Sequence, residues 1–325
     1  MNTFIIAEAG ANHNKDFKQA LALIDVAVKA GADACKFQTY SSETLYSKNV
    51  PDFAGYKNIN QLIKDIELPR EWQKYLKQYC DEKDIEFMST PFDEKAVDEL
   101  INLGVKRLKI AGFEATDFRF VEMVASSKLP LIISLGIGFK YEWIDKLLNI
   151  TSKYTNDITL LHCNNAYPTP IDDIDLNTVK KLSLDSRFKC GLSDHTMSTL
   201  VPALAVAAGA QVIEKHFTLS KHLPGPDHPF ALEPIQLMEM ISNIRIAEIA
   251  FTQQNEEYSS SEKDFIKARR SIVAKTNIKK GEIFTKDNIT TKRPFLENCI
   301  SASEFENILG KTAEEDYIND DFIKL

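Results

Sequence analysis

The stretch FIIAEAGANHNKDFKQALALIDVAVKAGADACKFQTY, residues 4–40, decides the fold. It begins with a short apolar run at 4–10 and continues with a segment at 15–32 whose apolar residues recur at helical spacing. A second apolar run follows at 33–40. Short apolar runs are typical of buried strands, and a 3.6-residue period is typical of an amphipathic helix. The stretch therefore predicts a strand, a helix and a second strand.

The same alternation continues for roughly 250 residues, the usual size of a TIM barrel. Six further strand-like runs lie at 85–90, 105–110, 129–136, 158–163, 189–194 and 211–217. Helical segments between or after them include 93–104, 197–210 and 233–251. Eight βα units in this order predict an α/β fold of the TIM (β/α)8 barrel type. A doubly wound open sheet also alternates strands and helices, and it is the alternative.

Polar side chains cluster where nearly every predicted strand ends, and this feature separates the two folds. In chain order they are Glu8, Lys36, Gln38, Ser89, Thr90, Lys109, Ser134, His162, Asn165, Ser193, His195, Lys215 and His216. A barrel builds its site from many strand ends at one mouth, whereas an open sheet gathers its ligand at one switch point. The spread of polar residues favours the barrel.

The composition changes after residue 252. Residues 252–264, TQQNEEYSSSEKD, are polar and lack apolar periodicity, which is typical of a linker. About 60 residues follow, with short strand-like runs and a KKGE turn, and a unit this small is marginally stable by itself. We therefore expect a barrel domain at 1–252, a linker at 253–262 and a small second domain at 263–325.

The composition also narrows the functional class. With 39 basic and 47 acidic residues the net charge is −8, which argues against a dedicated nucleic-acid or anionic-membrane binder. The five cysteines form no CxxC pair, so neither a disulfide framework nor a zinc cluster is indicated, and a reducing compartment fits. The N-terminal residues lack a signal-peptide pattern, and no apolar run approaches the ~18 residues of a spanning helix. We expect a cytoplasmic protein that holds any anionic ligand at a local site.

Two histidines end the last two predicted strands, in SDHT (193–196) and EKHFT (214–218). Adjacent parallel strands lie about 4.8 Å apart, so the imidazoles of His195 and His216 can reach one divalent cation. A two-ligand site with open positions suits a Lewis acid that polarises a carbonyl. A lone histidine is more often a hydrogen-bonded structural residue, and that interpretation stays open.

Three lysines, Lys36, Lys109 and Lys215, lie in or at the ends of predicted strands, where a buried cation needs an anion. Nearby donors that suit anionic oxygens are Thr90, Ser134, Asn165 and Ser193, so the set predicts a cradle for phosphate and carboxylate. The alternative to an anion-binding role is that each lysine forms an ion pair with a protein carboxylate or extends its ammonium group to solvent. A desolvated lysine can also form a Schiff base with a keto acid, which keeps a metal-free aldolase using Lys109 or Lys36 open.

Three acidic residues are further candidates. Glu8 and Glu114 are either general bases or ion-pair partners of these lysines. The run HLPGPDHPF (222–230) is rich in turn formers, which predicts that Asp227 and His228 lie on a loop over the mouth. A bland surface turn is the alternative for this run.

Motifs along the whole chain resemble one family. The strings IIAEAGANHN, ADACKFQTY, STPFD, LHCNNAYPTP, GLSDHT, VIEKHFTL, PGPDH and LEP occur in this order. Together with IKKGEIFTKDNITTKRP near the C-terminus, they resemble the bacterial sialic acid synthases, which carry a small antifreeze-like (SAF) domain. The resemblance implies an enzyme that condenses phosphoenolpyruvate with an N-acylated amino sugar to a nine-carbon acidic sugar. Mixed motifs leave the sugar unassigned among N-acetylmannosamine and the diacetamido-trideoxyhexoses.

The resemblance also implies residue roles and partners. Mn²⁺ or Mg²⁺ would be bound by His195 and His216. Phosphoenolpyruvate would be held by Lys36, Thr90, Lys109, Ser134, Asn165 and Ser193. The amino sugar would face Gln38, Tyr167, Asp227 and Arg293, while Glu8 and Glu114 match acidic residues near the reacting carbons. A domain-swapped homodimer is implied as well, in which the small domain of one subunit covers the barrel of the other and Arg293 reaches the sugar.

Two positions depart from the family pattern. In KIAGFEATD (109–117), Gly112 stands where many members carry a phosphate-contacting serine, and in SLG (134–136), Leu135 replaces a commoner threonine. The first departure implies a missing donor, so Gly112→Ser should tighten phosphoenolpyruvate binding. A non-catalytic sugar-binding protein is therefore a third alternative, although the histidine pair and Glu114 argue against it.

Overall fold

The computed structural model describes residues 2–52, 55, 57–252 and 258–324. The chain divides into two compact units, Met1–Thr252 and Gln253–Leu325, and each is described by itself. The expected linker at 253–262 lies partly outside the described residues.

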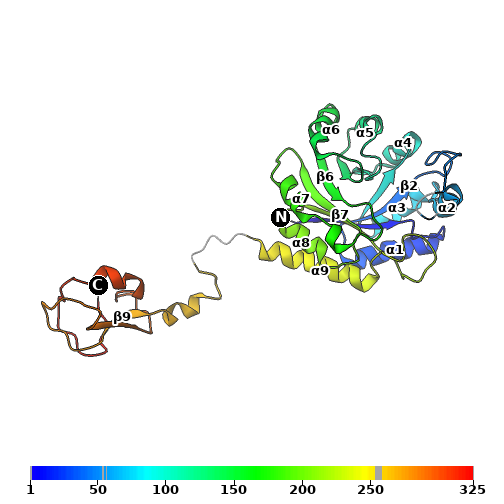
Figure 1. The fold of residues 1–325 in the computed structure, drawn as a ribbon. Helices are drawn as coiled ribbons and strands as arrows, with labels where there is room; N and C mark the ends of the chain where they lie inside the picture. Colours follow the sequence, from blue (N-terminus) through cyan, green and yellow to red (C-terminus); the bar gives the residue numbers. More distant parts are fainter. Residues whose placement is uncertain (1, 53–54, 56, 253–257, 325) are drawn as a thin grey trace. The chain divides into compact units, whose positions relative to one another are not determined.

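An eight-stranded parallel sheet forms the centre of the first unit. Its strands are β1 (Phe4–Gly10), β2 (Ala34–Thr39), β3 (Glu86–Pro91), β4 (Leu108–Ile110), β5 (Leu131–Leu135), β6 (Ile158–Cys163), β7 (Lys189–Asp194) and β8 (Val212–His216). The strand order is β3-β2-β1-β8-β7-β6-β5-β4, and β3 also lies next to β4, so the sheet curls into a nearly closed barrel (Figure 1). The TIM barrel that the sequence predicts is confirmed.

Helices cover the outside of the barrel (Figure 1). They are α1 (Phe17–Ala30), α2 (Ile59–Ile66), α3 (Trp72–Glu82), α4 (Glu94–Leu103), α5 (Phe118–Ala125), α6 (Ile144–Thr151), α7 (Leu176–Ser183), α8 (Val201–Ala207) and α9 (Pro234–Ala250), with 3-10 turns at Tyr141–Trp143 and Ile171–Asp173. Local chemistry sets their ends. The side chain of Asp16 accepts hydrogen bonds from two backbone N–H groups at the start of α1, and Gly31 ends the helix in the left-handed region at φ 83°.

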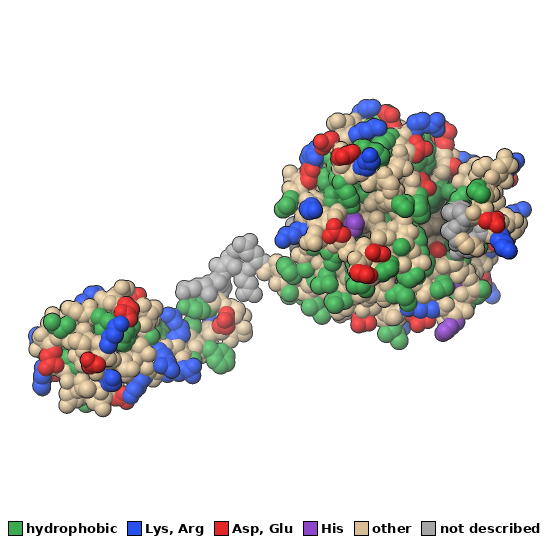
Figure 2. Space-filling view, in the orientation of Figure 1, with side chains coloured by type: hydrophobic (Ala, Val, Ile, Leu, Met, Phe, Trp, Pro, Cys, Tyr) green, Lys and Arg blue, Asp and Glu red, His purple; other side chains and the backbone are tan. Residues whose placement is uncertain are grey.

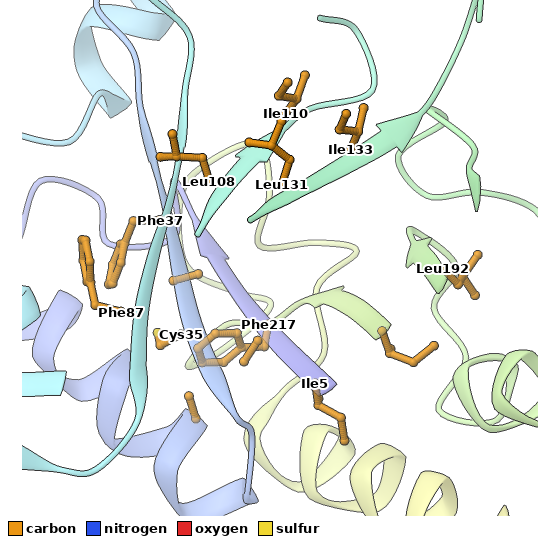
Figure 3. Close-up of a cluster of buried hydrophobic side chains, with 14 of the residues drawn as sticks. Ile5, Cys35, Phe37, Phe87, Leu108, Ile110, Leu131, Ile133, Leu192 and Phe217 are labelled. Atoms are coloured by element: carbon orange, nitrogen blue, oxygen red, sulfur yellow. The ribbon is translucent and has the colours of Figure 1, made fainter. Parts of the chain in front are cut away.

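Strand alternation sorts apolar side chains into two cores. Side chains that face the helices, including Ile5, Phe37, Leu108, Ile133 and Leu192, are fully buried in the main core (Figure 3). A smaller cluster fills the floor inside the barrel: Ile6, Ala34, Met88, Ile132, Leu161 and Val212. Because successive side chains point to opposite faces, the residues two positions further along also point inward. They are Glu8, Lys36, Thr90, Ser134, Cys163 and Glu214, so a polar layer lies directly on an apolar floor.

The second unit has its own small core. Its antiparallel strands are β9 (Ser271–Ala274) and β10 (Ile289–Lys292), accompanied by the short helix α10 (Phe305–Ile308) and 3-10 turns at Lys263–Ala268 and Ala302–Glu304. The core consists of Ile272, Ala274, Ile278, Phe284, Ile289, Ile308, Ala313, Tyr317 and Ile323. The predicted small β-rich C-terminal domain is confirmed.

Among the described helices, none combines the length and apolar character needed to cross a membrane. Exposed apolar side chains do gather on one face of the barrel, over α8 and α9 (Figure 2). They include Leu200, Leu204, Ile246 and Ile249, each at least 47% exposed. A contiguous surface of this kind is typical of a protein–protein contact.

Candidate active site

A cavity opens at the C-terminal mouth of the barrel, above the apolar floor. Its lining is Glu8, Lys36, Gln38, Thr90, Lys109, Ala111, Gly112, Ser134, Cys163, Asn165, Tyr167, Ser193, His195, Glu214 and His216. We call it the inner cavity. All six residues expected to hold phosphoenolpyruvate, and both histidines, contribute to this single lining.

Lys36 and Glu8 form the first half of a buried charge network in the inner cavity. The Lys36 Nζ atom lies 2.8 Å from Glu8 Oε2 and donates a 3.0 Å hydrogen bond to Thr90 Oγ1. The Gln38 side-chain amide donates to Glu8 Oε1 at 2.9 Å. Both ionisable side chains are about 2% exposed or less, so the pair is held by the protein rather than by solvent.

Glu214 completes this network, and the sequence interpretation missed it. Its two carboxylate oxygens each lie 3.6 Å from a lysine, Oε2 from Lys36 Nζ and Oε1 from Lys109 Nζ. The Ser193 hydroxyl donates to Oε1 at 3.1 Å. The signal was available in β8, because Glu214 lies two residues before His216 and therefore on the same inward face.

Lys215 does not belong to the inner cavity, which corrects the expectation for a third cradle lysine. Its Nζ atom lies on the other face of β8, 2.6 Å from Asp194 Oδ2, and it also donates to the Thr196 carbonyl. His162 likewise faces away from the interior and lies 2.7 Å from the Tyr141 hydroxyl through Nδ1. Both residues lie at strand ends, but their side chains point to the outer face of the strand rather than into the mouth of the barrel.

Burial and the neighbouring charges tune the two lysines in opposite directions. Burial lowers the pKa of Lys109. Burial acts the same way on Lys36, but the carboxylates of Glu214 and Glu8 outweigh it and raise the pKa of this lysine. Burial raises the pKa of Glu8 to about 7, although Lys36 opposes the rise. Glu8 can therefore exchange a proton near neutral pH while Lys36 stays charged.

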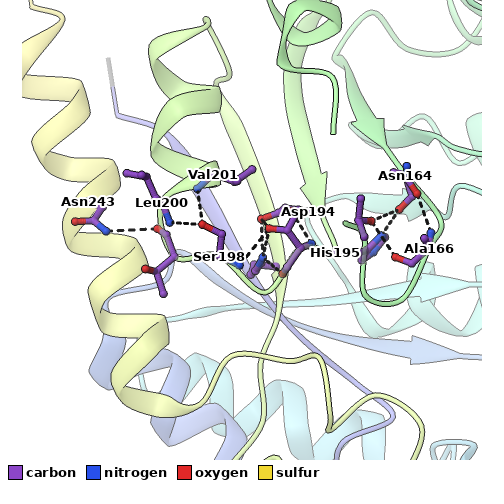
Figure 4. A network of polar contacts seen from close by, with 12 residues as sticks. Asn164, Ala166, Asp194, His195, Ser198, Leu200, Val201 and Asn243 are labelled. Carbon is purple, nitrogen blue, oxygen red and sulfur yellow. Dashed lines mark hydrogen bonds and ion pairs between the residues drawn. The ribbon is translucent and has the colours of Figure 1, made fainter. Parts of the chain in front are cut away.

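The histidine pair has the properties of metal ligands. The Nδ1 atom of His195 lies 2.6 Å from the Asn164 carbonyl oxygen, which can only accept, so Nδ1 carries the proton and the lone pair remains on Nε2 (Figure 4). The Nδ1 atom of His216 is buried and has no hydrogen-bond partner among the described residues. The ring centroids lie 5.5 Å apart.

Both imidazoles are neutral at physiological pH. Burial lowers the pKa of His195 to about 4 and lowers that of His216 well below its usual value. Neutral rings with free lone pairs are what a divalent cation requires. Within the described part of the chain, no group of three or more His, Cys, Asp or Glu side chains is arranged to hold a metal. A cation held here would have the two imidazoles as its ligands from these residue types and would keep open positions for substrate.

A second, larger cavity of about 480 Å³ adjoins the first and shares Gln38, Ala111, Asn165, Tyr167 and His216 with it. We call it the outer cavity. Its remaining lining is Ala11, Tyr40, Leu45, Tyr46, Ile59, Leu62, Ile63, Ile66, Phe92, Phe113, Pro226, Asp227 and Phe230. Three of the four residues expected to face the sugar, Gln38, Tyr167 and Asp227, lie on its wall.

The loop that carries Asp227 is held in place by hydrogen bonds and is not merely a surface turn. The fully buried His228 lies 2.6 Å from the Thr218 hydroxyl through Nδ1 and 3.2 Å from the Asn14 side-chain oxygen through Nε2. The backbone N–H of Ala11 donates to Asp227 Oδ2 at 3.3 Å. The loop thus fixes one carboxylate at the rim of the outer cavity.

Two expected site residues, Glu114 and Arg293, are not among the residues that line either cavity. Glu114 is on the loop after β4, and one of its carboxylate oxygens is buried with no hydrogen-bond partner in the described part of the chain. Burial raises the pKa of Glu114 to about 7, with Lys109 acting against the rise. Arg293 is an exposed residue of the C-terminal unit.

Gly112 is required by close packing at the mouth. A Cβ atom there would lie 2.9 Å from Asn165 Oδ1 and 3.1 Å from Gly136 Cα, both closer than ordinary contacts. Asn165 Oδ1 also accepts a 2.7 Å hydrogen bond from the Ile137 backbone N–H, which holds the amide in this place. The missing side chain at position 112 therefore makes room for Asn165, and a serine there would disturb it.

Comparison with known proteins identifies the family of both units. Residues 23–256 match the NeuB family and residues 269–324 match the SAF domain. The chain is 40% identical to the N,N'-diacetyllegionaminic acid synthase of Legionella pneumophila, over 95% of this chain and 90% of that protein. It is 34% identical to a pseudaminic acid synthase of Campylobacter jejuni, over 99% of this chain and 95% of that protein.

A solved structure extends the similarity to three dimensions. The N-acetylneuraminic acid synthetase of Leptospira borgpetersenii, in complex with citrate, matches with a TM-score of 0.75 at 35% identity, over 82% of this chain and 91% of that one. The barrel, the small C-terminal domain and the family match over most of the sequence lead to one conclusion: the chain belongs to the NeuB family and carries a C-terminal SAF domain.

Proposed function

We propose that this protein is a nonulosonic acid synthase that condenses phosphoenolpyruvate with an N-acylated amino hexose, giving a nine-carbon 2-keto-3-deoxy acid and phosphate. One observation carries the proposal. The inner cavity places two buried lysines, several hydroxyl donors and a neutral histidine pair together, and it adjoins a cavity large enough for a sugar. The names of the legionaminic and pseudaminic acid synthase relatives support the same reaction class.

Phosphoenolpyruvate is an anion with a phosphate and a carboxylate, and the inner cavity offers donors for both. Lys36 and Lys109 supply charge, while Thr90, Ser134 and Ser193 supply hydroxyl groups on neighbouring strands. Lys109 Nζ already lies 2.8 Å from Ser134 Oγ, so these donors are fixed before a ligand arrives. Preorganised donors stabilise departing phosphate without rearrangement.

His195 and His216 would hold Mn²⁺ or Mg²⁺, which supplies Lewis-acid activation of the sugar's open-chain aldehyde when it is bound. The protein's part is to present both rings as neutral donors at fixed positions. The Asn164 carbonyl sets the orientation and tautomer of His195.

Proton transfer is the task of a carboxylate whose pKa lies near 7. The methylene carbon of phosphoenolpyruvate attacks the aldehyde carbon, and the aldehyde oxygen takes up a proton to become a hydroxyl group. Water adds to the resulting cationic centre, and the tetrahedral adduct collapses to the ketone as its C–O bond to phosphate breaks. The attacking water must lose a proton, and Glu8 can accept it because it lines the inner cavity with a pKa of about 7. Glu114 has a similar pKa and is the second candidate, placed on the adjoining loop.

A Schiff-base aldolase remains the alternative for one specific reason: burial lowers the pKa of Lys109, which favours a nucleophilic amine. Lys36 is a poor candidate because two carboxylates keep it charged. Reduction with borohydride in the presence of pyruvate would attach a three-carbon adduct to an aldolase. The same treatment leaves a synthase unmodified.

We further propose a cytoplasmic homodimer in which the SAF domain of one subunit covers the barrel of the other and brings Arg293 to the sugar. The exposed apolar surface over α8 and α9 supports a contact between protein subunits.

The decisive experiment combines phosphoenolpyruvate, a panel of N-acylated hexoses and Mn²⁺, and follows phosphate release and product mass. A product whose mass corresponds to sugar plus pyruvate supports the proposal, and chelation with EDTA should abolish it. Binding of sugars without phosphate release would instead support a non-catalytic protein.

A further inference from the structure

Lys215 and Asp194 form an ion pair directly behind the two histidines, on the face of the sheet that points towards the helices. The Lys215 Nζ atom lies 2.6 Å from Asp194 Oδ2, and the two side chains are 1% and 0% exposed. The pair joins the last register partners of β7 and β8. Each residue is followed by a histidine, His195 after Asp194 and His216 after Lys215. The ion pair therefore connects the two strands at the level where the imidazoles begin.

The backbone holds the two histidines to different degrees. His216 is the last residue of β8 and pairs with Glu8 of β1. His195 lies one residue beyond the end of β7, outside the ladder between β7 and β8. Its carbonyl oxygen accepts a 2.9 Å hydrogen bond from the Thr169 backbone N–H, and its ring is oriented by the Asn164 carbonyl (Figure 4). Both of these partners lie on the loop after β6, so they do not connect His195 to His216.

Lys215 connects the chain on both sides of His195 to β8. Its ammonium group contacts the Asp194 carboxylate, which precedes the histidine, and donates to the Thr196 carbonyl oxygen, which follows it. The Asp194 carboxylate also accepts a 2.8 Å hydrogen bond from the Thr196 backbone N–H and a 3.1 Å hydrogen bond from the Thr196 hydroxyl. His195 therefore lies at the tip of a tight turn, and both ends of that turn are bound to the residue next to His216.

The surroundings of the pair are apolar, and stability alone does not account for charges at this place. The residues two positions earlier on the same faces of the strands, Leu192 and Ile213, are fully buried in the main core. Buried ion pairs can often be replaced by apolar side chains without loss of stability. An ion pair differs from an apolar contact because it acts at a defined distance and direction, so it can hold two strand ends in one relative position.

We propose that Lys215 is a positioning residue for the metal site: through Asp194 and Thr196 it fixes the place of His195 relative to His216. The inference rests on the proposed function, in which these two imidazoles hold Mn²⁺ or Mg²⁺. A cation held by two side chains depends on their spacing, because metal–ligand distances vary by only about 0.2 Å. Groups that orient metal ligands typically contribute a factor of about 10 to 100 to metal affinity.

The test is a calorimetric titration of the metal-free, full-length protein with Mn²⁺ in the absence of substrates. Lys215→Met should raise the Kd for Mn²⁺ at least about tenfold. The double variant Lys215→Met/Asp194→Asn also removes the carboxylate charge that the single variant leaves unpaired, and the new amide oxygen can still accept a hydrogen bond from Thr196. The urea midpoint of the double variant should therefore recover towards that of wild type, while its Mn²⁺ affinity stays low.

Arg107→Met is the matched control, because it removes an ion pair at the opposite end of the barrel. Arg107 lies directly before β4, and its Nε atom is 2.7 Å from Oε1 of Glu86, the first residue of β3. The Mn²⁺ affinity of this variant should equal that of wild type, whatever its urea midpoint. An equal loss of Mn²⁺ affinity in the control would trace the effect of Lys215→Met to stability and overturn the inference.

The remaining outcomes separate the inference from the proposed function. Wild-type Mn²⁺ affinity in Lys215→Met, or in the double variant, would show that the pair only stabilises the fold, and it would leave the synthase function intact. A wild-type protein that binds no Mn²⁺ would remove the metal assignment, and the inference with it.

Discussion

The barrel and the C-terminal unit use charged residues in opposite ways. In the barrel, Lys36, Glu8 and Glu214 are withdrawn from water and held by neighbouring strands. In the C-terminal unit, the ion pair between Lys279 and Asp316 lies on the surface, with side chains 73% and 57% exposed. Buried charges are costly and persist only where a rigid scaffold fixes their partners, whereas surface pairs contribute little. The comparison indicates that the barrel, unlike the surface pair of the small unit, contains buried charged groups held at fixed positions.

The largest expected effect is loss of the histidine pair. His195→Ala or His216→Ala should lower kcat by at least about a hundredfold, more than the loss of a group that only orients a metal-binding side chain. The folded state should survive, and calorimetric titration with Mn²⁺ should show lost binding. Lys279→Ala in the C-terminal unit is the control and should keep full activity. An active variant without detectable metal binding would contradict the metal assignment.

Removal of the C-terminal unit should have the next largest effect. The barrel has a complete core of its own, so a chain ending at residue 255 should give a cooperative thermal transition. We expect its synthase activity to fall to a few per cent or less, because a covering domain excludes water and orients the sugar. Arg293→Ala in the full chain should raise the KM for the sugar more than that for phosphoenolpyruvate. Full activity of the truncated chain would show that the barrel works alone.

The two kinds of ion pair can be compared directly by stability. Lys215→Met leaves Asp194 buried and unpaired, which should lower the free energy of unfolding by about 3–5 kcal/mol. Lys279→Met removes an exposed pair and should leave the urea midpoint unchanged. Similar midpoints for the two variants would remove the distinction between the regions.

The fold is predictable from the sequence because the alternation of strand and helix repeats eight times. The direction in which each site residue points, into the barrel or towards the helices, is harder to predict. The sequence pattern predicts that Lys36, Lys109 and Lys215 lie together at the mouth, whereas in the structure Lys215 faces away from the inner cavity and Glu214 lines it. A shift of one residue along a strand moves a side chain to the opposite face of the sheet. Which residues of a strand point into the barrel is then set by how the strand pairs with the strands beside it. Helix α2 is not among the predicted elements, although Ile59, Leu62, Ile63 and Ile66 recur at helical spacing, so this part of the outer cavity's lining could have been found from the sequence.

The packing around Gly112 could not be predicted from the sequence either, and it leads to a prediction with a smaller expected effect. The family pattern alone implies that Gly112→Ser restores a donor and tightens phosphoenolpyruvate binding. Because a Cβ atom would meet Asn165 at 2.9 Å, we expect instead a severalfold increase in the KM for phosphoenolpyruvate. Gly112→Ala separates the two contributions, since it adds the Cβ without the hydroxyl. If the serine variant binds phosphoenolpyruvate more tightly than wild type, the packing argument is wrong.

The smallest effect concerns a single carboxyl group of the barrel. Burial raises the pKa of Glu114 from its usual 4.5 to about 7, with Lys109 opposing the rise. Between these two values the folded state binds more protons than the unfolded state. The contribution of Glu114 to stability is therefore fully present below pH 4.5 and is lost as the pH rises towards 7.

Glu114→Gln removes this titration, so the variant should gain stability relative to wild type as the pH rises from about 5 to about 8. Urea unfolding at the two pH values measures the difference. Glu122→Gln is the control, because the Lys153 side chain beside this exposed carboxyl lowers its pKa and the sign of any effect on stability is reversed.

If Glu114 is also the base that accepts a proton from water, the acidic limb of the profile of kcat against pH, near pH 7 in wild type, should disappear in Glu114→Gln. A retained limb near pH 7 would instead assign that step to Glu8, whose pKa is also about 7 and which lies inside the inner cavity.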